Sequence, residues 1–337
     1  MIIKKKLIFA LLFAFVMSIL FWQVLDLTTR LTPDLDNHFA NLEKYYLKFD
    51  IISSGNLELS ASIKDYFKIK IDIGYIFLNY LSYILGLNFE NFLFIAIFLT
   101  YIVYIITFYR LTSCKKSIMY VLLILFASFW MNSTLGATLR QGIAISFLYY
   151  FLFNNNKTSF KKAFFIIILS SLIHMSAIIL IPYLIFEKIF IKRLKLLSLF
   201  FVIVTTLYIL DLNLFMKDII VYLADAINIE TRSLMGNRPD HPSVGFSIGK
   251  LLATIIPLIL FLLAFCINKN PIQMTERRMY VYYIYASSLG MLLSQMTYYE
   301  RLLMYAWAFS PFLLTFFCNT IYSSFIISLN KNFKSIK

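Results

Sequence analysis

Residues 251–268, LLATIIPLILFLLAFCIN, form a continuous apolar run without a single charged side chain. A helix of about 20 such residues crosses the hydrocarbon core of a bilayer. Similar runs cover residues 7–25, 91–110, 118–132, 137–153, 163–186, 196–210, 279–297 and 304–325, with a weaker one at 73–87. At about 20 residues per span, these runs predict an all-α, polytopic bundle of about 8–10 membrane helices.

The composition agrees with a membrane protein. Hydrophobic residues make up 61% of the 337 residues and charged residues only 14%, whereas soluble domains are about 45–50% apolar and about 25% charged. The apolar runs are continuous rather than alternating, which excludes a porin-like barrel. The N-terminal run 7–25 resembles a signal peptide but is too long for one, so we interpret it as the first span.

We expect one integral membrane domain over residues 1–337, with two long polar loops at 26–72 and 211–249. The cysteines Cys114, Cys266 and Cys318 have neither metal-ligand nor disulfide spacing. The sequence also lacks the glycine-rich nucleotide-binding motifs and the zinc-protease motif. We therefore expect no metal, no cofactor and no nucleic-acid partner.

The distribution of charge predicts the orientation. Of the 31 Lys and Arg residues, 19 lie in clusters whose acidic companions are only Glu187 and Glu276; the clusters are 4–6, 110–116, 157–162, 188–195, 269–278 and 331–337. Lys and Arg beside membrane spans mark the cytoplasmic side. Both termini are therefore predicted to be cytoplasmic, and both long loops to lie outside.

This orientation constrains the run 163–186, because the basic clusters on both sides of it are cytoplasmic. The run is predicted to be a re-entrant-like hairpin near 163–190, with His174 close to its tip, where polar residues interrupt the apolar pattern. Residues 26–72 are expected outside and 110–116 inside, so the single span 91–110 is enough to connect them. The run 73–87 then becomes a dipping or interfacial element on the outer side. Such elements are tolerated where they line a cavity. The alternative is that each hairpin consists of two thin, tilted spans, which would leave the flanking segments on the same sides of the membrane.

Arg140 opens the run 137–153 after a short outer turn. An arginine within a span costs about 2.5 kcal/mol or more, and its planar fork of donors suits phosphate oxygens. The alternative is a side chain that extends to the outer interface. His174 has two interpretations as well: a hydrogen-bonded packing residue, or a group that donates to a phosphate or exchanges a proton.

The third candidate region is the stretch Tyr298 to Arg301, predicted as a short outer turn between two spans. Arg140, His174 and Arg301 would then converge on one face of the membrane, which suits a lipid pyrophosphate. Asp34, after the first span, is a candidate general base toward a sugar hydroxyl, or part of a solvated acidic loop. Candidate substrate-binding residues lie near these positions or in the outer loops: Gln141, Asp36, Asp72, Arg232, Arg238, His241, Tyr299 and Glu300.

Several stretches resemble the EpsG-like branch of the Wzy-type polysaccharide polymerases. They are 34–39 (DLDNHF), 72–75 (DIGY), 85–88 (LGLN), 139–144 (LRQGIA), 171–177 (SLIHMSA) and 300–302 (ERL) with Tyr305. The arginine element followed by the histidine element is the most specific pair. The sequence departs from the family pattern at Pro33 and His38, where that pattern has glycine and tyrosine, and at Asp72 and Ile73, where it has glutamate and proline.

The resemblance implies a multi-span enzyme, similar in architecture to GT-C-like glycosyltransferases, in the bacterial cytoplasmic (inner) membrane. It would join undecaprenyl-pyrophosphate-linked oligosaccharide repeats on the outer face, toward O-antigen, capsule or exopolysaccharide. The expected partners are that lipid-linked oligosaccharide and the bilayer, with a chain-length regulator and a flippase as further candidates. The alternatives are a transporter or flippase of the same lipid, which usually shows internal repeats that this chain lacks, and a lipid-sugar ligase.

Overall fold

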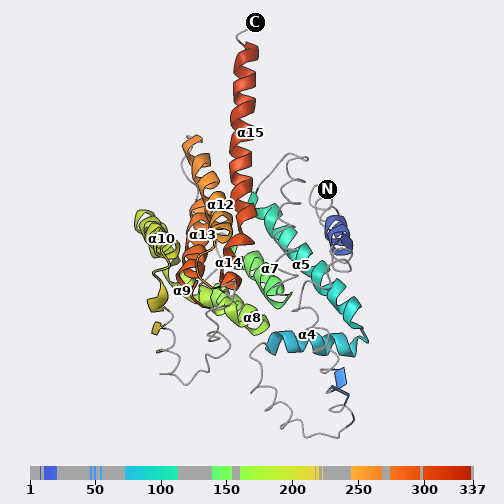
Figure 1. Ribbon diagram of the computed structural model, residues 1–337. Helices are drawn as coiled ribbons and strands as arrows, with labels where there is room; N and C mark the ends of the chain where they lie inside the picture. The colour runs from blue at the N-terminus through green and yellow to red at the C-terminus, as the bar shows by residue number, and fades with distance from the viewer. Residues whose placement is uncertain are drawn as a thin grey trace. The chain divides into compact units, whose positions relative to one another are not determined.

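The structure is a computed structural model in which the described residues are almost entirely helical (Figure 1). It describes residues 11–20, 46–47, 49–50, 73–112, 139–153, 160–216, 244–267, 274–296 and 299–334, together with 8, 54, 218, 219 and 222. Within these residues there is no strand, which confirms the predicted all-α class. Among the described residues, three helical stretches are long and apolar enough to cross a membrane: Glu90–Thr107, Ile248–Ile267 and Glu300–Tyr322. The protein is therefore a polytopic helical membrane protein.

The chain divides into two compact units, which we describe separately. Unit 1 comprises Met1–Ser113 and Ser128–Ile181, and unit 2 comprises Cys114–Ala127 and Pro182–Lys337. Parts of both predicted outer loops, 26–72 and 211–249, lie outside the described residues. The expectation of a single domain, and the side of the membrane on which the loops lie, stay predictions.

Unit 1 is built on α5 (Phe89–Thr112), α7 (Leu139–Phe153) and α8 (Phe160–Ile173), with α7 in contact with both of the others. At 1.5 Å per residue α5 is about 36 Å long, enough to cross the hydrocarbon core. The helix α4 (Ile73–Ile84) leads into α5 and also contacts α8 (Figure 1). Unit 1 thus brings α4, which comes early in the chain, against helices that come much later.

The weak apolar run at 73–87 forms the short helix α4. Its 12 residues span about 18 Å, roughly half of what a membrane crossing needs. One side of α4 is buried, with Tyr75, Asn79 and Ser82, while Phe77 and Ile84 are exposed. Its length fits the predicted dipping or interfacial element.

A segment of the first long loop is anchored to α4. The hydroxyl of Tyr46 bonds the Ser82 hydroxyl at 2.5 Å and donates to the Leu87 carbonyl at 2.7 Å. Tyr83 donates to the Asp50 carboxylate at 2.5 Å. These bonds hold Tyr46 and Asp50 against the C-terminal end of α4 and the turn that follows it.

The predicted break in the run 163–186 is present at His174. The helix α8 ends at Ile173, His174 is extended (φ −149°, ψ 115°), and a 3₁₀ helix η1 (Met175–Leu180) follows before α9 (Ile181–Lys192). The polar side chains of this stretch bond locally to the backbone, which competes with helical pairing. Because α9 belongs to unit 2, its return to the starting side of the membrane stays a prediction.

Unit 2 packs α10 (Leu194–Ile209) against α13 (Met274–Leu292), and α12 (Ile248–Ile267) against α15 (Ser310–Lys334). Aromatic rings fill the second contact: the ring centroid of Phe316 lies 5.1 Å from that of Phe261 and 4.9 Å from that of Phe265. Within unit 2 (Figure 1), the short helix α14 (Glu300–Trp307) packs against α13.

The end of the chain differs from the predicted pattern of a turn at 298–301 and one run at 304–325. Helix α14 begins at Glu300, so Glu300 and Arg301 lie in its first turn rather than in a loop. The helix then breaks at Ala308 and Phe309 before α15 begins. Pro311 explains the break, because proline lacks an N–H group and is favoured only in the first turn of a helix. The Ser310 hydroxyl donates to the carbonyl of Trp307 at 2.7 Å, which satisfies one end of α14.

Candidate functional site

The first candidate site begins with Gly74, which lies against the C-terminal end of α8. A Cβ atom at this position would lie 3.0 Å from the carbonyl carbon and oxygen of Leu172 and 3.1 Å from the amide nitrogen of Ile173. These distances are tighter than nearly all real Cβ contacts. The peptide that Gly74 touches is followed directly by His174, so glycine lets α4 approach the backbone that leads to the candidate histidine.

The neighbouring residue, Tyr75, faces Arg140. The guanidinium carbon of Arg140 lies 5.7 Å from the centroid of the Tyr75 ring, within the range of a cation–π contact. The Tyr75 ring is buried (5% exposed) and packs against Phe92 on α5. Arg140 itself is only partly buried and sits at the first turn of α7. A rigid aromatic side chain therefore holds one side of the guanidinium.

His174 is held by its own backbone and by Ser176. Its Nδ1 accepts the backbone N–H of Ser176 at 3.4 Å and lies 2.6 Å from the Ser176 hydroxyl. A nitrogen that accepts an N–H group carries no proton, so in the neutral ring the proton is on Nε2. This tautomer makes Nε2 a hydrogen-bond donor. Of the two roles considered above, it favours donation to an oxygen over removal of a proton.

We define the Arg140 site as Gly74, Tyr75, Arg140, His174 and Ser176. Its chemistry is dominated by donors: the five N–H groups of a guanidinium and the Nε2–H of an imidazole. The helix α7 contacts η1, so Arg140 and His174 come from neighbouring elements of unit 1. Donors of this kind match phosphate oxygens. Gln141, expected beside Arg140 as a substrate ligand, is completely buried within α7.

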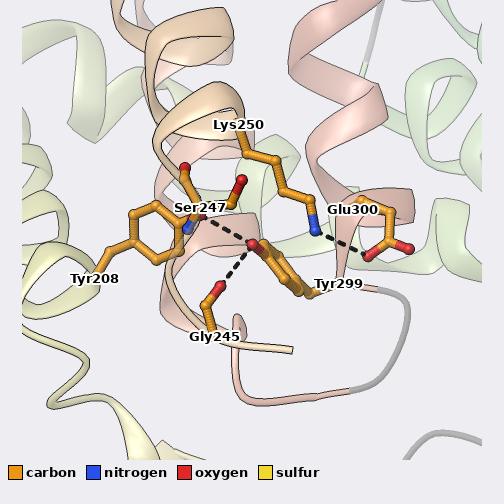
Figure 2. A network of polar contacts seen from close by, with 6 residues as sticks. All are labelled: Tyr208, Gly245, Ser247, Lys250, Tyr299 and Glu300. Atoms are coloured by element: carbon orange, nitrogen blue, oxygen red, sulfur yellow. Dashed lines mark hydrogen bonds and ion pairs between the residues drawn. The ribbon is translucent and has the colours of Figure 1, made fainter. Parts of the chain in front are cut away.

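The second candidate site surrounds Tyr299, directly before α14 (Figure 2). Its hydroxyl donates to the carbonyl of Gly245 at 2.8 Å and lies 2.9 Å from the hydroxyl of Tyr208. The Tyr208 hydroxyl in turn accepts the Ser247 N–H at 3.0 Å. Burial is the main reason that the pKa of Tyr299 lies above its ordinary value, so the hydroxyl stays protonated. These bonds tie the start of α14 to α10 and to the chain before α12.

Beside this network, Lys250 pairs with Glu300. The Lys250 Nζ lies 3.7 Å from Glu300 Oε2 and 4.3 Å from the centroid of the Tyr299 ring. Figure 2 shows the ammonium group between the ring and the carboxylate. We call Lys250, Tyr299 and Glu300 the Lys250 cluster. Arg301 follows in the same turn of α14 and is partly buried.

A further set of hydrogen bonds, around Asn213, lies at the same end of unit 2. Asn213 Nδ2 donates to the Met291 carbonyl at 2.7 Å, which is one of the last carbonyls of α13, and lies 2.6 Å from the Ser294 hydroxyl. The Ser294 carbonyl accepts the Gly245 N–H at 2.9 Å. Gly245 has a positive φ of 85°, which favours glycine. Gly245 thus joins this group to the network of Tyr299.

The opposite end of α13 carries a different ion pair. Arg278 Nε donates to Glu187 Oε1 at 2.7 Å, and the Tyr183 hydroxyl donates to the same oxygen at 2.9 Å. Glu187 was noted in the sequence only as an exception among basic residues. Its pairing with a residue 91 positions away could not be inferred from local pattern.

Six of the predicted site residues lie outside the described residues: Asp34, Asp36, Asp72, Arg232, Arg238 and His241. The others fall into the two units, with Arg140, Gln141 and His174 in unit 1 and Tyr299, Glu300 and Arg301 in unit 2. The structure adds three residues to the predicted site residues: Gly74, Tyr75 and Lys250. A charged residue at the very edge of an apolar run, such as Lys250, is a signal that the sequence did offer. Among the described residues, no group of three or more His, Cys, Asp or Glu side chains could hold a metal ion.

The fold and the two sites define a polytopic, helical membrane protein with donor-rich and charged side chains at helix ends. The EpsG family model matches residues 40–333, and the chain belongs to the EpsG family. No curated protein and no solved structure matches the chain. The match includes 72–75, 139–144, 171–177 and 300–302, but it begins after 34–39, the stretch that contains Asp34 and Asp36. Membership of this family indicates a membrane protein of polysaccharide biosynthesis, of the polymerase kind.

Proposed function

We propose that the protein is a polysaccharide polymerase that joins undecaprenyl-pyrophosphate-linked oligosaccharide repeats on the outer face of the bacterial cytoplasmic membrane. The observation that carries this proposal is the Arg140 site. There Gly74 and Tyr75, from the short helix α4, meet both Arg140 and the backbone leading to His174. A packed ring and local hydrogen bonds hold two donor groups in place at partly exposed positions.

In this reaction, a sugar hydroxyl of one lipid-linked repeat attacks the anomeric carbon of the growing chain. The bond from that carbon to the pyrophosphate breaks, and undecaprenyl pyrophosphate leaves with the electron pair. Negative charge grows on the leaving group, and preorganised donors stabilise such charge in a transition state. The Arg140 guanidinium and the His174 Nε2–H are the donors we assign to the pyrophosphate, since charge-assisted hydrogen bonds to phosphate are the strong ones.

The proposal also includes the membrane, the partner proteins and the product of the reaction. The substrates and the catalyst would share one bilayer, and the basic clusters beside the spans support a cytoplasmic location of both termini. A flippase would supply the repeats at the outer face, and a chain-length regulator would act on the product. The product is an O-antigen, a capsule or an exopolysaccharide, and the chemistry is the same for each.

Deletion of the gene in its native host tests the assignment against the two alternatives. Loss of a polymerase leaves single lipid-linked repeats on the outer face, where a sugar-cleaving enzyme added to spheroplasts digests them. Loss of a flippase leaves the repeats protected inside. Loss of a ligase leaves long chains on the lipid. We expect single, digestible repeats, which the wild-type gene removes and the Arg140→Ala gene does not; either of the other patterns would contradict the proposal.

A further inference from the structure

The first loop and α4 together form a cluster of aromatic rings within unit 1. The centroid of the Phe49 ring lies 5.2 Å from that of Tyr80 and 5.5 Å from that of Tyr83. The centroid of the Tyr46 ring lies 5.5 Å from that of Tyr83. Asp50 joins the cluster through its hydrogen bond from Tyr83. We call these five residues the Tyr80 cluster.

One ring of the cluster is open, and it rests on a covered one. Tyr80 is 43% exposed, whereas Phe49 is 8% exposed. The hydrogen bonds of the Tyr46 hydroxyl to α4 and to the turn after it help to fix the loop segment that carries Phe49. Side chains that are held in place before binding lose little entropy when a ligand arrives. Tyr80 therefore presents a supported ring to a ligand.

Asp50 adds a hydrogen-bond acceptor beside the rings. Its Oδ1 accepts the Tyr83 hydroxyl at 2.5 Å, which orients the carboxylate, and the residue is exposed. A carboxylate can accept about four hydrogen bonds, so the bond from Tyr83 leaves it able to accept from a ligand as well. Tyrosines at a membrane interface commonly form a belt at the level of the headgroups. Such a belt does not require an oriented carboxylate among its rings.

Rings beside a carboxylate match the chemistry of a sugar. The face of an aromatic ring carries partial negative charge, and the C–H groups on one face of a pyranose carry partial positive charge. Sugar hydroxyls are donors, and hydrogen bonds to an ionised acceptor are the stronger kind. Asp50 would repel the phosphate of a lipid headgroup. The Tyr80 cluster therefore suits a sugar ring better than an anionic lipid.

Helix α4 relates the Tyr80 cluster to the Arg140 site. Tyr75, which faces Arg140, precedes Tyr80 by five residues and Tyr83 by eight, or about 7.5 Å and 12 Å along the helix axis. At about 100° per residue, Tyr80 and Tyr83 lie between the side of α4 that exposes Phe77 and the side that buries Tyr75. A pyrophosphate bound at Arg140 would thus have the sugars beyond its first one within reach of Tyr80.

We propose, resting on the polymerase function above, that the Tyr80 cluster is a sugar subsite of the Arg140 site. Tyr80 stacks against a pyranose ring of the lipid-linked repeat, and Asp50 accepts a hydroxyl of that sugar. The sugar is not the one bonded to the pyrophosphate but one further along the repeat. Phe49 supports the Tyr80 ring, and Tyr83 orients the carboxylate. The subsite distinguishes a complete repeat from the lipid carrier alone, which has no sugar to place there.

Equilibrium binding to the full-length protein in nanodiscs tests this subsite with two probes. They are the single lipid-linked repeats that accumulate in the deletion strain, and undecaprenyl pyrophosphate without sugar. Tyr80→Ala should raise the Kd of the repeat about tenfold, which corresponds to about 1.4 kcal/mol, and leave the Kd of undecaprenyl pyrophosphate unchanged. Tyr80→Phe keeps the ring and should bind both probes as the wild type does. The matched control, Phe77→Ala, removes an exposed ring from the apolar side of the same helix and should also bind both normally.

Two results would overturn the proposal. One is a Tyr80→Ala protein with wild-type affinity for the repeat. The other is an equal loss of affinity for both probes, which would indicate a general effect on the fold. Failure of the proposed function looks different, because the deletion strain would then accumulate no single, digestible repeats, or the wild type itself would bind neither probe.

Asp50 is tested with the same two probes. Asp50→Asn keeps the shape of the side chain but removes its charge, so it should weaken binding of the repeat and leave that of undecaprenyl pyrophosphate unchanged. Tyr83→Phe should cause a smaller loss that is equally selective. Combined with Asp50→Asn it should add little, since residues that act as a unit are not additive. Wild-type binding by Asp50→Asn would overturn the role of the carboxylate, and a full additional loss in the double variant would overturn that of Tyr83.

Discussion

Gly74 and Leu172 are in backbone contact, although 98 residues separate them in the sequence. A Cβ atom at position 74 would lie 3.0 Å from the Leu172 carbonyl oxygen. Because Tyr75 faces Arg140 and Leu172 leads to His174, this single contact relates both candidate donors of unit 1 to each other.

Gly74→Ala should therefore abolish or strongly reduce polymer. The neighbour is backbone, which cannot rotate away, and overpacking typically costs about 1–3 kcal/mol. The expected effect is a displaced Tyr75 and His174 with protein still present in the membrane, measured as polymer length on a gel beside an immunoblot. The control is Gly249→Ala, where a Cβ would meet nothing within 4 Å. Normal polymer from Gly74→Ala would show that the close approach is dispensable.

Arg140 should require its planar fork of donors. Arg140→Ala and Arg140→Lys should both lose polymer at normal protein levels, because a point charge cannot donate two parallel bonds to a phosphate. Arg301→Ala should also lose polymer, because Arg301 follows Glu300 in the first turn of α14 and is the second arginine that we expect to contact the pyrophosphate. Full-length chains from Arg140→Lys would mean that charge alone suffices.

The ring of Tyr75 should matter and its hydroxyl should not. Tyr75→Phe keeps a face for the guanidinium and should polymerise, whereas Tyr75→Leu removes the cation–π contact, worth about 0.5–2 kcal/mol. We expect shorter chains from the leucine variant, read from the same gel. Equal chain lengths from the two variants would argue that the contact with Arg140 has no influence.

His174 should act as a donor. Its Nδ1 accepts from Ser176, so Nε2 carries the proton of the neutral ring. A glutamine amide can donate a hydrogen bond but cannot exchange a proton at neutral pH. His174→Gln should thus retain measurable polymer, and His174→Ala should have much less. Complete loss in both would favour proton transfer, and wild-type polymer in both would leave His174 as a packing residue.

Tyr299→Phe should destabilise unit 2. The hydroxyl donates to Gly245 and pairs with Tyr208 in a buried position, and loss of such a bond leaves a carbonyl unpaired at a cost of about 1–3 kcal/mol. We expect a lower melting temperature of the purified protein in detergent. Tyr80→Phe, at a side chain that is 43% exposed, provides the comparison and should melt as the wild type does.

Sequence reasoning predicted what depends on local pattern. The continuous apolar runs predicted an all-α membrane bundle, and the cluster of polar residues around His174 predicted the end of α8 there. The weak run at 73–87 forms the 12-residue helix α4, whose length fits the predicted dipping or interfacial element. Each of these features is decided by neighbouring residues, so the sequence contains the signal.

Contacts between distant segments were not predictable in this way. Tyr208 and Tyr299 are 91 residues apart, and nothing in the periodicity of either helix indicates the other. Lys250 was one residue outside an apolar run and so resembled an ordinary loop cation. The start of α14 at Glu300 was missed because the apolar pattern alone does not show that a helix begins before its first apolar residues.

The shortness of α4 has a consequence for biogenesis. At about 18 Å, it cannot be held in the bilayer as a span, and Leu172, its partner, is made 98 residues later. Synthesis proceeds from the N-terminus at about 5–20 residues per second. Newly made α4 must therefore wait for several seconds at the translocon without its partner. Nascent chains arrested before residue 172 should remain sensitive to protease at α4, so the step that completes the Arg140 site is also a step in the maturation of the protein.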